Sequence, residues 1–346
     1  MKKLIIILFA ALSLLACGDE GRPTPQGQKS IDPHKPMAWG KKHVIYVFAD
    51  EVVWQGAEKQ LRRTLEREYF TTENEKFFEI KRVPFADLEQ FYKYNNLIFM
   101  GDISSQTKVN EYINSVISPR IKAEVEENVV GIYPVENLWA NDQYVLFMLG
   151  SSTQKLLELN YLHLNQTFEL FKAKLFERFR SQLYAGDIYP RSTFRDFPWQ
   201  LKLPQKYRVY KKDKAGNFVS YLARLRDKPD RYISVYYQAA EHDIVDKEWL
   251  IEKRAELAWE YYDEDEYVEE NLRSRKYQFA GFSGWRIDGT WMNKKYTAGG
   301  AFQSFAFYDE ETQQAFLIDN SVYYPEGFKL DALIELELIS ETIQLK

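Results

Sequence analysis

The sequence contains a single cysteine, Cys17, among 346 residues, and only four histidines. One thiol cannot close a disulfide within the chain, and it cannot supply the several sulfur ligands of a structural zinc site or an iron–sulfur cluster. The histidines are also not placed at metal-ligand spacings; they are His34, His43, His163 and His242. Neither a metal nor another cofactor is therefore expected, and burial of side chains must hold the fold together.

The common catalytic signatures are missing as well. The chain has no G-x-S-x-G, no H-E-x-x-H, no P-loop and no G-x-G-x-x-G after a strand. One formal match, Ser152-Thr153-Gln154-Lys155, has the S-x-x-K spacing of penicillin-interacting enzymes, but the accompanying S-D-N and K-T-G elements are absent. Because Ser152 lies where a helix is expected to begin, a role in capping that helix is favoured.

An acidic run, Asp263-Glu264-Asp265-Glu266, is the remaining place where a cation could be attracted. It lacks the glycine and the ligand spacing of an EF-hand loop. A solvated loop or helix end is therefore the favoured interpretation of this run.

Positive charge is not in excess. The formal net charge is −5, and it becomes about −7 once Lys2 and Lys3 are removed with the segment described next. This balance disfavours nucleic acid as a partner.

The apolar run from Leu4 to Leu15 is too short to cross a bilayer as a finished helix, which takes about 20 residues. It follows the basic pair Lys2 and Lys3, as in an export signal that is later cleaved. The run ends in Leu14-Leu15-Ala16-Cys17, a small residue before the only cysteine. This ending resembles the lipobox of bacterial lipoproteins.

The lipobox resemblance implies that residues 1–16 are a signal peptide and that Cys17 becomes the lipidated first residue of the mature chain. Its thiol would carry a diacylglyceryl group, and its amino group usually an acyl chain such as palmitate. Two or more chains hold a protein firmly on a membrane. The protein is thus expected to be exported and anchored to a bacterial membrane, on its periplasmic face or at the cell surface. Lipidation would also use the only thiol, so a cysteine nucleophile is excluded.

The mature chain of about 330 residues is too long for one ordinary core, which predicts two domains. Residues 17–40 are rich in proline and nearly free of apolar side chains, so they are interpreted as a flexible tether. Between residues 41 and 185, strand patterns alternate with helical patterns, which is typical of an α/β layer domain. Strands are expected at 43–49, 77–83, 96–101, 128–133 and 143–149, and helices at 51–68, 86–92, 108–117 and 152–184.

Residues 197–346 show short strands joined by tight turns, with a helix after Asp246 and another at 328–343. This pattern predicts an antiparallel sheet with packed helices, so the whole chain is expected to be α+β. Its strands are expected at 199–203, 207–210, 218–225, 231–237, 284–292, 301–308 and 315–323. Aromatic residues make up 16% of the sequence, which suits a β-rich core; a surface platform for sugars or peptides is the alternative use.

Several segments in a fixed order resemble the bacterial lipoproteins that carry domain of unknown function 4837. They are the lipobox, 49–54 (ADEVVW), 203–207 (LPQKY), 284–291 (GWRIDGTW), 299–302 (GGAF) and 319–325 (DNSVYYP). The resemblance extends over nearly the whole mature chain. It implies an envelope lipoprotein, and it supplies no catalytic residues because that family has no established activity. The strand order of the second half also resembles Mog1/PsbP-like antiparallel folds, a likeness that carries no function.

Two places are candidate binding sites. Asp50, Glu51 and Trp54 follow the first strand, and ligands of open α/β sheets tend to lie at the carboxyl ends of strands. Asp50 is equally suited to be the N-cap of the helix that follows. Asp319 is a further candidate, from the last of the matching segments.

The second place is the strand that begins at Gly284. Alternation sends Trp285, Ile287 and Trp291 to one face and Arg286, Asp288 and Thr290 to the other. If the first face is core, the second presents a charged pair to a ligand; a salt bridge on an exposed strand is the plainer interpretation.

The leading hypothesis is a non-catalytic lipoprotein of the bacterial envelope that binds or assembles with an envelope protein or a glycan. The alternative is an envelope hydrolase, possibly acting on glycans, that works by paired carboxylates. Its candidate residues are Asp50, Glu51, Asp288 and Asp319. That mechanism requires two carboxyl groups about 5 to 10 Å apart in one cleft.

Overall fold

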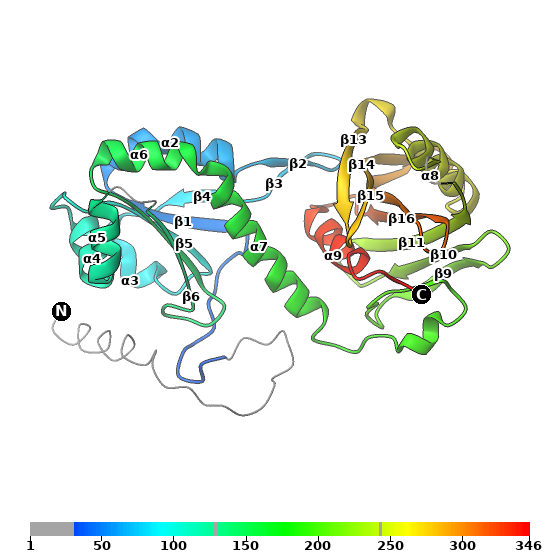
Figure 1. The fold of residues 1–346 in the computed structure, drawn as a ribbon, viewed down its shortest axis with the longest axis horizontal. Coiled ribbons are helices and arrows are strands. Elements are labelled where there is room, and N and C mark those ends of the chain that lie inside the picture. Colours follow the sequence, from blue (N-terminus) through cyan, green and yellow to red (C-terminus); the bar gives the residue numbers. More distant parts are fainter. Residues whose placement is uncertain (1–30, 128–130, 242–243) are drawn as a thin grey trace. The chain divides into compact units, whose positions relative to one another are not determined.

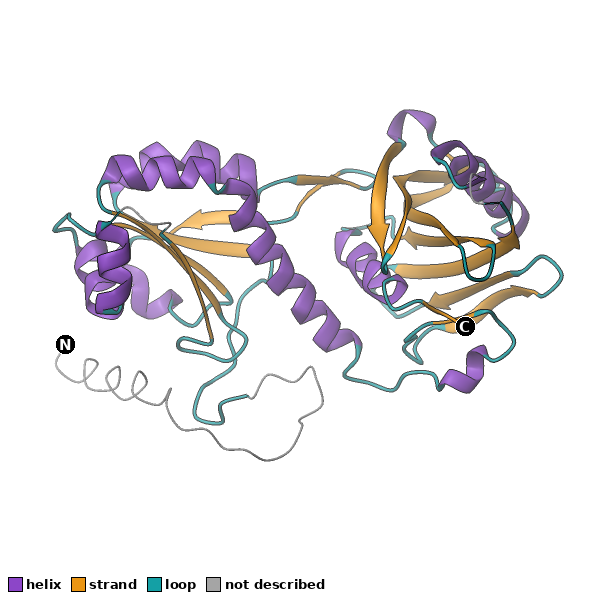
Figure 2. Cartoon of the chain, in the orientation of Figure 1, coloured by secondary structure: helices purple, strands orange, loops and turns teal. Residues whose placement is uncertain are grey.

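The computed structural model describes residues 31–127, 131–241 and 244–346. The signal peptide, Cys17 and residues 17–30 of the expected tether lie outside the described residues. The chain divides into two compact units, Met1–Pro36 and Met37–Lys346, and every element below belongs to the second. That unit contains a mostly parallel sheet followed by an antiparallel one, each packed with helices, which confirms the predicted α+β class (Figures 1 and 2).

The N-terminal sheet has the strand order β4-β1-β5-β7-β6, in which β6 alone runs antiparallel to its neighbour. Its strands are β1 (Val44–Ala49), β4 (Glu79–Arg82), β5 (Asn96–Asp102), β6 (Ile132–Glu136) and β7 (Tyr144–Gly150). All residues of β5 and β7 are buried because helices cover both faces of the sheet. This burial explains why these strands are continuous apolar runs in the sequence.

Helices α2 (Glu51–Leu65), α6 (Thr153–Leu162) and α7 (Leu164–Leu183) pack on one face of this sheet (Figure 1). Helices α3 (Leu88–Phe91), α4 (Lys108–Val116) and α5 (Pro119–Glu126) pack on the other. The sequence pattern predicts one helix over 152–184, whereas the structure has two helices there, α6 and α7. They are separated at His163, whose φ of −110° and ψ of 22° leave the helical region.

A short hairpin that the sequence did not predict joins α2 to β4. It consists of β2 (Glu68–Phe70) and β3 (Asn74–Lys76), with Tyr69 opposite Glu75. Each strand has three residues and mixed polarity, so no alternating pattern is long enough to reveal it.

The C-terminal sheet is antiparallel and has eight strands in the described part of the chain, in the order β12-β14-β15-β16-β11-β10-β9, with β13 also paired to β14. Its strands are β9 (Arg208–Asp213), β10 (Phe218–Ala223), β11 (Asp230–Ala239), β12 (Glu266–Tyr267), β13 (Arg273–Phe279), β14 (Phe282–Asn293), β15 (Ala298–Asp309) and β16 (Gln314–Tyr323). A separate two-stranded pair joins β8 (Trp199–Gln200) to β17 (Gln344–Leu345).

Two helices cover opposite faces of this sheet, α8 (Lys247–Tyr261) and α9 (Leu330–Ser340) (Figure 1). Ile287, Phe302 and Leu317 pack with α8, whereas Phe305 and Ile318 pack with α9. Successive residues of the central strands therefore enter two different cores. Within the described ranges, no helix is both long enough and apolar enough to cross a bilayer.

Candidate functional site

Asp50, Glu51 and Trp54 lie at the carboxyl end of β1; Asp50 and Trp54 are engaged inside the fold, whereas Glu51 is exposed and pairs with Arg82. Asp50 Oδ1 accepts a hydrogen bond from the Val53 amide at 3.2 Å, as the N-cap of α2. Its Oδ2 accepts hydrogen bonds from the Thr107 hydroxyl at 3.1 Å and from the side-chain amide of Asn110 at 3.3 Å. The capping interpretation of Asp50 is thus the one that the geometry matches.

The other two residues of this group are equally occupied. Glu51 accepts from Arg82 at 2.6 Å and from Gln55 at 2.7 Å, and the Arg82 hydrogen bond lowers the pKa of its carboxyl. Trp54 is only 6% exposed and belongs to the core between α2 and the sheet. Asp50 and Trp54 are therefore not left to project toward a ligand, whereas the Glu51 side chain is 61% exposed in its ion pair with Arg82.

Arg286 and Asp288 lie on the face of β14 that α9 covers. Arg286 donates from Nε to Asp288 Oδ1 at 2.9 Å and from Nη2 to the same oxygen at 2.7 Å. Its Nη1 donates to Glu337 of α9 at 2.9 Å. Arg286 is 3% and Asp288 8% exposed, so the expectation of a charged pair on an exposed strand is wrong. The alternation along the strand is nonetheless as predicted, since Trp285, Ile287 and Trp291 lie in the core on the α8 face.

The charges of this buried pair hold each other ionised. Burial by itself lowers the pKa of Arg286, but Glu337, Tyr69 and Asp288 outweigh it, and the pKa is raised well above its ordinary value. Burial likewise raises the pKa of the Asp288 carboxyl, but Arg286 and Arg275 outweigh that effect and lower it. Both groups are therefore charged at neutral pH.

Two neutral side chains complete the network, and neither could be found from a motif. Tyr69 of the β2–β3 hairpin donates to Asp288 at 2.6 Å and accepts from Arg286 at 2.9 Å. Gln303 of β15 accepts from Arg286 at 2.9 Å and donates to the Leu333 carbonyl at 2.7 Å. Burial raises the pKa of Tyr69 well above its ordinary value, so its hydroxyl keeps the proton that it donates. The network joins the hairpin to the C-terminal sheet.

Asp319 lies on the opposite face of the sheet, under α8. Its Oδ1 accepts from Arg254 at 3.2 Å and from the Ser304 hydroxyl at 2.5 Å. The Arg254 guanidinium stacks on the Phe302 ring, 3.6 Å from its centroid. The sheet therefore separates Asp319 from Asp288, and Asp50 and Glu51 belong to the other sheet. The four candidate carboxylates do not meet in one cleft.

Near Asp319, an acidic residue follows the end of α8, within the run for which a solvated loop or helix end is expected. Asp265 is half-buried, and it accepts from the Asn293 amide at 2.7 Å. Burial raises the pKa of its carboxyl to about 6. Asp263 and Glu264 before it have φ values of 55° and 72°, a left-handed backbone that turns the chain sharply there. The raised pKa of Asp265 therefore comes from its burial beyond the end of α8, which no sequence pattern reveals.

Trp291 points into the same core and is 7% exposed. Its ring lies 6.1 Å from that of Tyr323, and its Nε1 has no hydrogen-bond partner among the described residues. As placed, it is a core residue and does not offer a binding surface.

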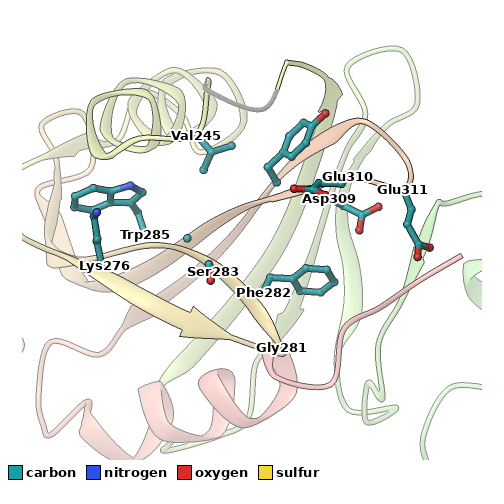
Figure 3. Close-up of a pocket in the computed structure, with 11 residues that line it drawn as sticks. Val245, Lys276, Gly281, Phe282, Ser283, Trp285, Asp309, Glu310 and Glu311 are labelled. Atoms are coloured by element: carbon teal, nitrogen blue, oxygen red, sulfur yellow. The ribbon is translucent and has the colours of Figure 1, made fainter.

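A concave surface of about 600 Å³ lies at the other end of the C-terminal sheet, where the β13–β14 and β15–β16 turns meet (Figure 3). Trp285 and Lys276 lie on one side of it, and Asp309, Glu310 and Glu311 lie on the opposite side. Val245, Phe282 and Ser283 also contribute to its wall. Alternation along β14 places Trp285 on its apolar face, but no local pattern links Trp285 to the acidic turn, because Asp309 lies 24 positions further along the chain.

Glycines fix the shape of this surface. Gly281 has a φ of +93°, which side chains other than glycine rarely allow. A Cβ on Gly284 would lie 2.0 Å from the Ala306 carbonyl oxygen, so the backbone of β14 could not approach β15 as it does. The turn that bounds the concave surface thus depends on its glycines.

Metal binding has no obvious place in this structure. Among the described residues, no group of three or more histidine, cysteine, aspartate or glutamate side chains is arranged to hold a metal ion.

Fold and site together define an α+β protein with a mostly parallel sheet, an antiparallel sheet and a concave surface on the antiparallel sheet. The C-terminal domain matches the family model described as Domain of unknown function (DUF4837), over residues 191–342. The N-terminal domain matches a second model, Domain of unknown function (DUF8532), over residues 38–184. The expected resemblance to the DUF4837 family is therefore supported for the four segments within 191–342, which are 203–207, 284–291, 299–302 and 319–325. The segment 49–54 lies instead in the region that the second model matches. No curated protein matches the sequence.

Solved structures give only distant likenesses. They include LpqN of Mycobacterium tuberculosis, described as involved in cell envelope biogenesis, with 11% identity and a TM-score of 0.26 over 43% of this chain and 83% of that one. The Ran-binding protein Mog1p of Saccharomyces cerevisiae has 11% identity and a TM-score of 0.31 over 43% and 90%. A protein of Bacteroides thetaiotaomicron has 8% identity and a TM-score of 0.25 over 46% and 47%. Scores this low carry no functional argument.

Proposed function

We propose that this protein is a non-catalytic binding component of a bacterial envelope, held at a membrane by lipid on Cys17. The observation that carries the binding role is the concave surface between Trp285 and the 309–311 turn, a place where charged and aromatic side chains gather around open space. Of the carboxylates suggested for hydrolysis, Asp50, Asp288 and Asp319 are held by internal partners, Glu51 pairs with Arg82 at the surface, and the four do not meet in one cleft. Binding is therefore favoured over hydrolysis.

The anchor is supported by the order of basic residues, apolar run and small residue before Cys17. The test is metabolic labelling with a radioactive fatty acid in a bacterial host. The wild-type chain should take up label and stay with the membrane fraction, and Cys17→Ala should lose both. Because the sequence has no other cysteine, label that persists in Cys17→Ala would refute the anchor.

The binding role is tested by affinity capture from membranes. The wild-type protein should recover a reproducible partner, and Trp285→Ala should reduce the recovery. Trp259→Ala is the matched control, because Trp259 is a tryptophan of α8 that is 54% exposed and does not line the concave surface. Recovery of the protein alone, or equal recovery by both variants, would contradict this role.

A further inference from the structure

We infer that the occupant of the concave surface is a short basic segment of a partner protein, in which lysine or arginine adjoins an apolar or aromatic residue. This inference rests on the proposed binding role and adds the chemistry of the partner.

The charge of the surface favours a cationic occupant. Among the described residues that line the surface, Asp309, Glu310 and Glu311 lie on one side, and Lys276, the one lysine or arginine among them, lies on the other. Asp309 is held in place because it accepts from the Thr312 amide at 2.9 Å and the Thr312 hydroxyl at 2.6 Å. Glu310 and Glu311 are exposed on the same turn. Complementary charge steers association and selects the partner.

The aromatic side favours an apolar or aromatic neighbour beside the basic residue. The ring of Phe282 stacks on that of Phe307, with 4.4 Å between centroids, so it forms a firm base. Trp285 packs on the other face of β14, the face that α8 covers, where it is also partly exposed and has the Lys276 ammonium 5.9 Å from its ring centroid. Partly exposed aromatic side chains are the usual anchors of protein interfaces.

The edges of the C-terminal sheet are less suited to a protein partner. In the described part of the chain, β9 and β13 each have one strand neighbour, so each has a free edge. Both carry exposed basic side chains, which natural proteins use to prevent strand addition. These side chains are Arg208, Lys211 and Lys212 on β9, and Arg273, Arg275 and Lys276 on β13. The concave surface is thus the better docking place.

The inference is tested with two defined peptides and the full chain in detergent. One peptide alternates arginine with leucine over six residues, and its counterpart replaces each arginine by glutamate. Calorimetric titration should show binding of the arginine peptide that weakens as salt is added, and no binding of the glutamate peptide. Equal binding of both peptides, or no binding of either, would overturn the inference.

Charge reversal locates the site. The double variant Glu310→Lys/Glu311→Lys should lower the affinity for the arginine peptide by about tenfold or more. Glu269→Lys/Glu270→Lys is the matched control, since these neighbouring glutamates are also exposed and do not line the surface. Equal affinities of the two double variants would contradict the inference.

The same variants separate this inference from the proposed function. If the captured partner is lost with Trp285→Ala but retained with Glu310→Lys/Glu311→Lys, the binding role stands and the basic segment is refuted. If no partner is captured at all while the arginine peptide binds as described, the binding role in the envelope fails and the chemistry of the surface stands.

Discussion

At the scale of single residues, Arg286 holds together the buried charge on the α9 face. It contacts Asp288 and Glu337 directly, and both carboxylates are under 10% exposed. Burying an ion pair contributes little net stability, but removing one partner leaves the other charge without compensation. Arg286 therefore contributes most to the stability of this network, because its guanidinium compensates the charges of both Asp288 and Glu337.

We expect Arg286→Ala to lower the free energy of unfolding by about 3 to 5 kcal/mol. Urea denaturation followed by circular dichroism measures the change. Arg275→Ala is the control, because Arg275 pairs with the same carboxylate at 2.6 Å but its side chain is 47% exposed. Its removal should lower the free energy by at most about 1 kcal/mol. Losses of equal size would show that burial does not govern the effect.

The second prediction concerns the carboxyl of Asp265 and the pH dependence of the free energy of unfolding. Burial raises the pKa of its carboxyl from 3.8 to about 6, so the folded state keeps this proton where the unfolded state has lost it. The protonated carboxyl therefore favours folding, and this contribution declines as the pH rises from about 4 to about 6. Asp265→Asn cannot ionise, so its stability relative to the wild type should increase across that range.

The measurement is urea denaturation of both proteins at several values between pH 4 and pH 7. Asp227→Asn serves as the control, since the Asp227 side chain is 88% exposed. A stability difference between wild type and Asp265→Asn that does not change with pH would contradict the expected titration.

At the scale of elements, α8 and α9 begin in different ways. The first turn of α8 is capped from within, because the Asp246 carboxylate accepts from the Trp249 amide at 2.7 Å. The first turn of α9 has no side-chain cap of its own. Instead, the buried Glu75 of the β2–β3 hairpin accepts from the Lys329 amide at 2.7 Å and the Leu330 amide at 2.8 Å. A carboxylate at this end is also favoured by the helix dipole.

We expect Glu75→Ala to speed amide hydrogen exchange in the first turn of α9 and to lower the free energy of unfolding by about 1 to 2 kcal/mol. Exchange in the first turn of α8 should stay as in the wild type. Asp246→Ala should have the reverse pattern. Faster exchange at both helices in either variant would mean that the loss of stability is global and is not specific to the cap.

At the scale of the whole molecule, the hairpin ties the two sheets together. One continuous core contains Ile45 and Leu61 of the N-terminal part together with Phe305 and Leu333 of the C-terminal part. Tyr69 and Glu75 add hydrogen bonds from the hairpin to β14 and α9. The C-terminal domain is therefore stabilised by residues that precede it in the chain.

A fragment of residues 186–346 should consequently be less stable than the same residues in the full chain. It lacks the Tyr69 hydroxyl and the Glu75 cap, which together suggest a loss of about 2 kcal/mol or more. Thermal unfolding of fragment and full chain measures the difference. An equal or higher melting temperature of the fragment would contradict it.

Local patterns identified most of the elements because they depend on neighbours in the chain. The apolar runs of β5 and β7, the helix after Asp50 and the alternation along β14 all follow from side-chain periodicity. Several elements escaped, among them α5, β12, β13 and the β2–β3 hairpin. The β2–β3 hairpin is too short for a pattern, and β13 carries charged residues on its exposed edge.

By itself, the sequence determined the α+β class and which β14 side chains share a face, and it offered the Asp50 cap of α2 as one of two alternatives. Tertiary structure alone decided that Arg286 and Asp288 are buried. It also decided that Tyr69 contacts Asp288 and that Glu75 caps α9, each across more than 200 residues of the chain. Finally, it placed Trp285 opposite the acidic turn at 309–311. The physical reason is that periodicity records which side of an element is apolar. Periodicity does not record which distant element covers that side or which charged side chains this element brings with it. Both depend on packing between segments far apart in the chain.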